Sequence, residues 1–244
     1  MTDRKIAFVA GGGKYGSGAL TYFMKEPDWN VIICDEDREC QASKLVRTIV
    51  ELKALGNPSK IRYPLMMVGD AAEALIRFFA DGIVPEIIVP CVPVHFAAKV
   101  LTGYLASLGL SVQPDARSLT IGFERVPLEE AEFALSENDA LALASKMPFN
   151  MRCASGCSQP ERCPVTGRPL AKAMYELITA TLNNTGADIV KVLRSHLLAP
   201  NIGGFSGKEL RQTVDLCIGK KPCTLALATS CSCHAVANVF KIGT

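Results

Sequence analysis

Apolar and polar positions alternate regularly along the first half of the chain. Short apolar runs, typical of buried strands, are each followed by a stretch with apolar residues at helical spacing. The predicted strands are Ile6–Ala10, a run ending at Asp35, Ile61–Val68, Ile83–Pro90 and Leu110–Val112. The predicted helices are a stretch after Gly16, Cys40–Leu55, a helix opened by Asp70 and Glu73, and Phe96–Leu108. This alternation predicts the α/β class, with a doubly wound, mostly parallel sheet that has helices on both faces.

From about Gln113 the pattern becomes irregular. We expect strands at Ser118–Glu124, Asp188–Leu197 and Cys223–Thr229, helices at Leu128–Lys146 and Leu170–Leu182, and a loop rich in Cys, Pro and Gly over 147–169. Ser206 and Glu209 form a capping-box pattern that opens a helix with Leu210, Thr213, Val214 and Cys217 on one face. The change of pattern predicts two domains, 1–115 and 116–244, the second a smaller α+β domain.

The first predicted strand runs into the pattern Gly11-x-Gly13-x-x-Gly16, and the second strand ends at Asp35. A strand, a glycine turn, a helix and an acid about 20 residues further on form the fingerprint of dinucleotide binding. Gly11 permits the tight turn, Gly13 lets a pyrophosphate approach the backbone, and Gly16 lets the helix pack close to the strand. The helix N-terminus offers free N–H groups to the phosphate. Asp35 would accept hydrogen bonds from the adenosine ribose and repel a 2′-phosphate, which favours NAD over NADP.

With the sequence Val68-Gly69-Asp70-Ala71 after the third strand, these motifs give the first ~110 residues a resemblance to a known family. They resemble the Rossmann-type nucleotide-binding domains of the TrkA family, which regulate potassium transport. NAD(P)-dependent dehydrogenases of the saccharopine or siroheme-synthesis type share the same opening. The resemblance implies a Rossmann-like dinucleotide-binding domain in which Asp70 begins a helix beside the nucleotide. The second half matches no family that we can name from its motifs.

Composition and charge exclude several classes of function. The chain has 244 residues and a formal net charge of +2, with no basic block or interleaved aromatic residues that would indicate nucleic-acid binding. It contains no run of 18 apolar residues, so we expect no membrane span. The apolar stretch near the N-terminus is too short and glycine-rich for a signal peptide, which predicts a cytoplasmic protein. Ten cysteines in that compartment point to metal binding or redox chemistry.

Five of the cysteines form two groups that are distant in sequence. The first group has the spacing Cys153-x3-Cys157-x5-Cys163, and the second is Cys231-x-Cys233 followed by His234. We expect the two groups to share one metal, because nearby thiolates repel one another unless a metal neutralises them. A [4Fe–4S] cluster suits thiolates from irregular loops, and zinc suits four thiolates or three thiolates and the His234 imidazole. Reduced structural cysteines without metal are the remaining alternative.

Cys91 and His95 follow the fourth predicted strand, at the sheet edge where doubly wound folds bind their ligands. They are the predicted catalytic residues, with His95 as an acid–base group; alternatively the prolines shape the turn and His95 packs. The combined prediction is an NAD(H)-binding redox protein with a cysteine-bound metal centre and a redox partner protein. A nucleotide- and redox-sensing regulatory module and a zinc-stabilised scaffold subunit are the alternatives.

Overall fold

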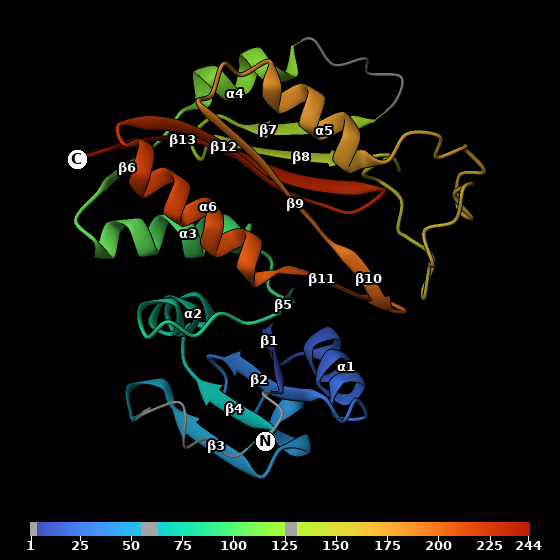
Figure 1. The fold of residues 1–244 in the computed structure, drawn as a ribbon. Coiled ribbons are helices and arrows are strands. Elements are labelled where there is room, and N and C mark those ends of the chain that lie inside the picture. The colour runs from blue at the N-terminus through green and yellow to red at the C-terminus, as the bar shows by residue number, and fades with distance from the viewer. Residues whose placement is uncertain (1–3, 55–62, 125–130) are drawn as a thin grey trace. The chain divides into compact units, whose positions relative to one another are not determined.

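The computed structural model describes residues 4–54, 63–124 and 131–244 (Figure 1). It is a mixed α/β structure, so the predicted class is confirmed. The chain forms two compact units, one of residues 1–103 and 202–211 and one of 104–201 and 212–244. We expected a single division near residue 115. The structure instead gives the first unit a short segment from the second half of the chain.

Among the described residues the first sheet has seven strands, and six of them belong to the first unit. They are β1 (Lys5–Ala10), β2 (Trp29–Asp35), β3 (Thr48–Glu51), β4 (Leu65–Val68), β5 (Ile87–Pro90) and β11 (Ile202–Ser206), in the order β11-β5-β1-β2-β4-β3. All neighbouring pairs are parallel except β11 with β5, which is antiparallel. The chain moves outward from β1 to β2 and on to the edge strand β3, comes back between β2 and β3 as β4, and then returns to the other side of β1 as β5. The strand order therefore reverses between β1 and β5.

Four described helices belong wholly or partly to this unit: α1 (Lys14–Phe23), α2 (Ala71–Ala80), α3 (Phe96–Ser107) and the first residues of α6 (Gly207–Lys220). Phe8 of β1 lies at the centre of the core, with ring centroids 6.0 Å from Phe78 and 6.4 Å from Phe96. The carboxylate of Asp70 caps α2 by accepting hydrogen bonds from the N–H groups of Ala72 and Glu73, as the sequence predicted. The predicted buried stripe of Leu75, Phe78 and Phe79 is confirmed.

The second unit is built around an alanine-rich sheet. Its strands are β6 (Ser111–Pro114), β7 (Glu132–Ser136), β8 (Leu141–Ser145), β9 (Ile189–Arg194), β12 (Cys223–Ser230) and β13 (His234–Gly243). The order is β7-β8-β13-β12-β9, and β6 pairs with β13. Helices α4 (Ala116–Phe123) and α5 (Met174–Asn183) cover one face (Figure 1). Small side chains such as Ala226, Ala228 and Ala237 let these helices pack close to the strands.

The remaining elements differ in where they belong. β10 (His196–Ala199) is the seventh strand of the first sheet and lies beside β11, and the short 3₁₀ helices η1 (Gln41–Leu45) and η2 (Leu52–Ala54) belong to the first unit. Helix α6 (Gly207–Lys220) begins in the first unit and ends in the second. In α6 the predicted apolar face is confirmed, because Leu210, Thr213, Val214 and Cys217 are all fully buried. The Ser206 hydroxyl accepts a hydrogen bond from the Glu209 N–H, which is half of the predicted capping box. Within the described ranges, no helix is both long and apolar enough to cross a membrane.

Four predicted elements were wrong. Cys40–Leu55 is not a helix, because the β-branched Thr48, Ile49 and Val50 pair with β4 as strand β3. Ser118–Glu124 lies in helix α4, not a strand, and Asp115 caps that helix. The described part of Leu128–Lys146 is the hairpin β7–β8, whereas 128–130 lie outside the described residues. Leu110–Val112 overlaps β6, which pairs with β13 in the second sheet rather than joining the first.

Candidate functional site

The glycine turn after β1 is held by close backbone contacts. Gly11 has a φ of +97°, and a Cβ built on it would lie 2.8 Å from the carbonyl oxygen of Cys91. A Cβ on Gly16 would lie only 1.8 Å from the carbonyl oxygen of Gly11. Both positions therefore require glycine for the packing of strand, turn and helix α1, whether or not a ligand binds.

Gly13 differs from these two glycines. A Cβ at Gly13 would meet no atom within 4 Å, so packing does not explain why glycine stands there. Gly13 is also the N-cap of α1, where no side chain accepts a hydrogen bond from the helix N–H groups and no acid lies in the first turn. A helix N-terminus of this kind leaves donors and a positive dipole end available to an anion. Glycine at position 13 therefore leaves open space beside the first N–H groups of α1.

A cavity of about 330 Å³ opens at the carboxyl ends of β1, β2, β4 and β5. Its size falls at the lower end of the range for small-molecule sites in proteins. It lies where the strand order reverses, the usual ligand position in open parallel sheets. Of the residues predicted to bind the cofactor, Gly11, Asp35 and Asp70 line it, whereas Gly13 and Gly16 do not. The lining residues are Gly11, Cys34, Asp35, Glu36, Gly69, Asp70, Ala71, Ala72, Val92, Pro93, Val94, Phe96 and Lys99.

Asp35 connects the end of β2 to the glycine turn. Its carboxylate accepts one hydrogen bond from the Gly12 N–H at 2.5 Å and another from the Asp37 N–H at 2.8 Å. These bonds give Asp35 a structural role. A carboxylate can accept about four hydrogen bonds, so Asp35 retains capacity for a hydroxyl group in the cavity. With Glu36 beside it, this wall of the cavity is acidic.

Sequence reasoning missed one charged residue of this cavity, Lys99. Its ammonium group forms a salt bridge with Asp70, and both side chains line the cavity. Burial alone would raise the pKa of Asp70, but hydrogen bonds from Lys99 and from the N–H groups of Glu73 and Ala72 outweigh burial and lower it. The only sequence signal for Lys99 was its place in the first turn of the helix after the fourth predicted strand.

The predicted catalytic residues, Cys91 and His95, are not among the residues that line the cavity. The N–H of Cys91 donates to the Ala10 carbonyl and extends the pairing of β1 with β5. Burial raises the pKa of the Cys91 thiol to about 11, so the thiolate form is disfavoured. His95 is buried, and its carbonyl oxygen accepts the Lys99 N–H in the first turn of α3. The structure therefore gives both residues positions in the turn between β5 and α3.

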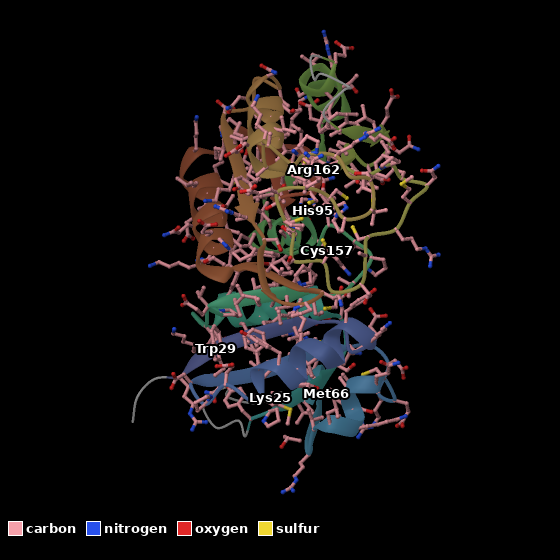
Figure 2. All side chains as sticks on the ribbon, turned by 90° about the vertical axis from the view of Figure 1, so that its right-hand side faces the viewer. Lys25, Trp29, Met66, His95, Cys157 and Arg162 are labelled. Carbon is pink, nitrogen blue, oxygen red and sulfur yellow. The ribbon has the colours of Figure 1, made fainter. Side chains whose placement is uncertain are left out.

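The second unit brings the two cysteine groups together around His234. The Cys153 sulfur lies 3.6 Å from His234 Nε2, and the Cys231 sulfur lies 3.8 Å from Nδ1. Cys153, Cys157, Cys163, Cys233 and His234 also line a small cavity of about 20 Å³, which is close to the space needed by one water molecule. Cys157 lies on the irregular loop 146–172 at one end of the second sheet (Figures 1 and 2).

Three of these thiols sit in turns whose N–H groups point at the sulfur. The Cys157 sulfur accepts the Gln159 N–H at 3.4 Å, and the Cys231 sulfur accepts the N–H groups of Cys233 and His234, also at 3.4 Å. For Cys163, hydrogen bonds from the Thr166 side chain and backbone lower the thiol pKa. At Cys163 these hydrogen bonds stabilise the thiolate over the thiol.

The other members of the group differ electrostatically. Burial and, to a lesser extent, the charges of Cys231, Cys157, Cys153 and Cys163 together raise the pKa of Cys233 to about 12. Burial lowers the pKa of His234, which keeps the imidazole neutral and able to act as a ligand. Across 4–54, 63–124 and 131–244, however, no group of three or more His, Cys, Asp or Glu side chains is arranged to hold a metal ion as it stands. The donors are close neighbours, but they do not form a coordination shell.

Four other cysteines are packing residues in the cores of the two units. Cys34, Cys40, Cys217 and Cys223 are all buried, and every cysteine of the chain has a free thiol. Burial raises the thiol pKa of Cys217 to about 12, with the charge of Cys223 as a further cause. Such thiols behave as small apolar side chains.

Comparison with known proteins gives two matching family models. Residues 6–96 match AF_1314_N, described as an uncharacterized protein, N-terminal domain, and residues 100–243 match AF_1314_C, described as an uncharacterized protein, C-terminal domain. The chain is also 27% identical over 233 residues to an uncharacterized protein of Archaeoglobus fulgidus, covering 96% of this chain and 98% of that protein. No solved structure matches. Because the AF_1314_C match spans more than half of the sequence, the chain belongs to that family.

Proposed function

We propose that this protein is an NAD(H)-binding redox protein with a cysteine-ligated metal centre in its second unit. The observation that carries the proposal is the meeting of two distant cysteine groups around His234, with N–H groups already directed at the sulfurs of Cys157 and Cys231. Neutral structural cysteines need no such turns. A second unit with clustered thiols, joined in one chain to a candidate nucleotide cavity, suits a protein that transfers electrons.

For the first unit, the proposal is a Rossmann-like, TrkA-like dinucleotide site. The reversal of strand order at β1 and β5, the cavity there and the unexplained glycine at Gly13 support it. The N-terminus of α1 and Gly13 would hold the pyrophosphate. Asp35 and Glu36 would face the adenosine ribose, and two carboxylates at that wall favour NAD over NADP. Bound NAD(H) supplies or accepts a hydride.

For the second unit, we propose that a [4Fe–4S] cluster is bound by four of Cys153, Cys157, Cys163, Cys231 and Cys233. Soft thiolates are the ligands that iron–sulfur clusters use, and the four positions can come from distant segments. Cys153 is exposed and the others are only half-buried, so the thiols can separate to admit a group larger than the present cavity. A bound cluster accepts and releases single electrons.

A zinc site is the second candidate, and one specific observation favours it. The present cavity has space for a single ion, and both nitrogens of His234 lie beside sulfurs. Three thiolates with one imidazole form a common closed zinc shell. In that case the metal would stabilise the loop and supply no electrons.

Anaerobic purification of the full chain tests these proposals. We expect iron and acid-labile sulfide in equal amounts and broad absorption near about 400 nm that reductant bleaches. The variant Cys157→Ser should lose the iron, the sulfide and this absorption. Cys91→Ser is the matched control, because that thiol belongs to the other unit. One zinc per chain without colour would overturn the cluster in favour of zinc, and absence of both metals would overturn the metal centre.

A separate titration tests the nucleotide. NADH should bind at least about tenfold more tightly than NADPH, and Asp35→Asn should reduce that ratio. Equal affinity would contradict the role of Asp35. Bound NADH together with a cluster, but no oxidation of NADH by an artificial acceptor, would identify a sensor rather than an enzyme.

A further inference from the structure

The loop that carries three of the clustered cysteines is strongly basic. Residues 146–172 contain Lys146, Arg152, Arg162, Arg168 and Lys172 but a single acid, Glu161, although the whole chain has a net charge of only +2. Arg152, Arg162, Arg168 and Lys172 are exposed. Figure 2 shows Arg162 on this loop, as it shows Cys157. A large share of the unbalanced positive charge of the molecule therefore surrounds the thiols.

The charges of these cations are not balanced by acidic side chains of the described residues. Within the described part of the chain, none of the five basic residues takes part in a salt bridge. Arg162 donates to the carbonyl of Gly167, and Lys146 donates to the carbonyl of Lys172, so two of them bond only to neutral backbone of the same loop. Their charge remains available to an external anion or an acidic surface.

One further cation and two acids lie near the clustered thiols but outside loop 146–172. The Arg194 guanidinium lies 4.0 Å from the ring centroid of Tyr175, and the next residue, Ser195, donates to the carbonyl of Ser230 beside Cys231. The carboxylates of Glu132 and Glu176 accept the N–H groups of Phe149 and Ala173. Counting these residues, the cations around the thiols still outnumber the acids by two to one.

The same loop exposes apolar side chains among the cations. Phe149, Met151 and Val165 are 48%, 46% and 40% exposed. An apolar centre with a charged rim is the usual composition of a protein–protein interface, and an arginine-rich rim of one sign steers a partner of opposite charge. Single-stranded nucleic acid would need a row of aromatic residues for stacking, but Phe149 is the only aromatic residue in 146–172.

We propose that loop 146–172 is the docking surface for a small acidic electron-carrier protein that exchanges single electrons with the metal centre. This inference rests on the proposed function and names its partner. Cys153 is exposed, and Cys157 and Cys163 are half-buried, so a docked carrier would approach the metal-binding thiols directly. In each exchange one electron passes between carrier and centre. One of them is oxidised, the other is reduced, and no bond is made or broken.

Binding of a plant-type [2Fe–2S] ferredoxin, an acidic carrier, to the full metal-loaded chain tests the proposal. We expect binding by calorimetry that weakens at least tenfold between about 50 and 300 mM salt, and no binding of a basic cytochrome c. The double variant Arg162→Glu/Arg168→Glu should weaken ferredoxin binding about tenfold or more. The control Lys25→Glu/Lys44→Glu makes the same charge change on exposed lysines of the first unit and should change the affinity less than threefold.

Equal weakening in both double variants would overturn the docking surface, because the effect would then follow net charge. Binding of a single-stranded oligonucleotide or anionic vesicles in preference to ferredoxin would also overturn it. Metal content, NADH affinity and melting temperature are measured on every variant. If a chain without iron binds ferredoxin, and this binding depends on salt and on the loop, the docking surface is supported and the proposed function is contradicted. If a chain loaded with iron does not bind ferredoxin, the proposed function is supported and the docking surface is contradicted.

Discussion

The two candidate sites differ in how far they are built into the fold. In the first unit, two residues that line the cavity also hold the fold together, because Gly11 allows close packing against Cys91 and Asp35 joins β2 to the glycine turn. Gly16, which belongs to the same turn, allows close packing of α1. In the second unit, the thiols lie on a loop and a hairpin end outside the alanine-rich core. Substitutions in the first site therefore disturb structure and binding together, whereas in the second site the two can be separated.

The largest effect expected from this difference is that of Gly16→Ala. The added methyl group would lie 1.8 Å from the Gly11 carbonyl oxygen, which neither strand nor helix can move away from cheaply. We expect destabilisation by about 3 kcal/mol or more in urea unfolding. Gly18→Ala in the same helix is the control: it meets no atom within 4 Å and should stabilise the unit by about 0.5–1 kcal/mol. Similar values for the two variants would contradict the close packing.

In the second unit the large effect should come from a helix cap, not from the thiols. Asp115 is 4% exposed, caps α4 through Ser118 and forms a salt bridge with Lys241. Asp115→Ala should cost about 2 kcal/mol in urea unfolding. Cys157→Ser in metal-free protein should cost less than about 0.5 kcal/mol, because the residue is outside the core. A larger loss of stability in Cys157→Ser would show that the thiol loop contributes to folding. It would contradict the difference proposed between the two candidate sites.

The pH dependence of stability should also show the contribution of the Asp115 cap. Burial alone would raise the pKa of Asp115, but hydrogen bonds from Ser118 and Lys241 outweigh burial and lower it below its ordinary value of 3.8. A lowered pKa stabilises the fold above the unfolded value, and this stability is lost as the pH falls through 3.8 toward the folded value. Asp115→Asn should therefore lose less stability than the natural protein between pH 5 and about pH 3. Parallel pH profiles would contradict this assignment.

The smallest effect on stability is expected at Gly13, the one position of the first site that separates binding from folding. Gly13→Ala has open space and an ordinary φ of −71°, so its stability should change by less than about 0.5 kcal/mol. NADH affinity should fall about tenfold or more, equivalent to about 1.4 kcal/mol, because the methyl group would occupy the approach of the pyrophosphate. Unchanged affinity would leave Gly13 without a role in binding.

The sequence predicted the first unit better than the second for a physical reason. Strands buried on both faces leave continuous apolar runs, and Asp70 and the glycine turn mark where helices begin. Around Ser118–Glu124 and Leu128–Lys146 the apolar spacing suits helix and strand equally, and partner strands decide the outcome. Strand β13 was not anticipated at all, although its pairing with β12 runs from Cys223 to Ser230.

The candidate sites show the same limit. Cysteine spacing was enough to select the five thiols, because few other roles suit such a loop. It could not show that His234 lies between Cys153 and Cys231, since that contact joins segments 81 residues apart. Lys99 escaped notice because one lysine on a helix has no distinctive pattern, and only the fold brings it to Asp70.

Strand β11 has a consequence for how this protein is made. It pairs with β5 through Phe205 and Ser206, yet it leaves the ribosome more than a hundred residues after β5. Gly204 and Gly207 fit so closely against Ile87 and Pro85 that no other segment readily takes their place. During translation, β5 therefore remains an unpaired edge strand until β11 has been synthesised. A truncated chain ending near residue 103 would keep that edge of the sheet exposed.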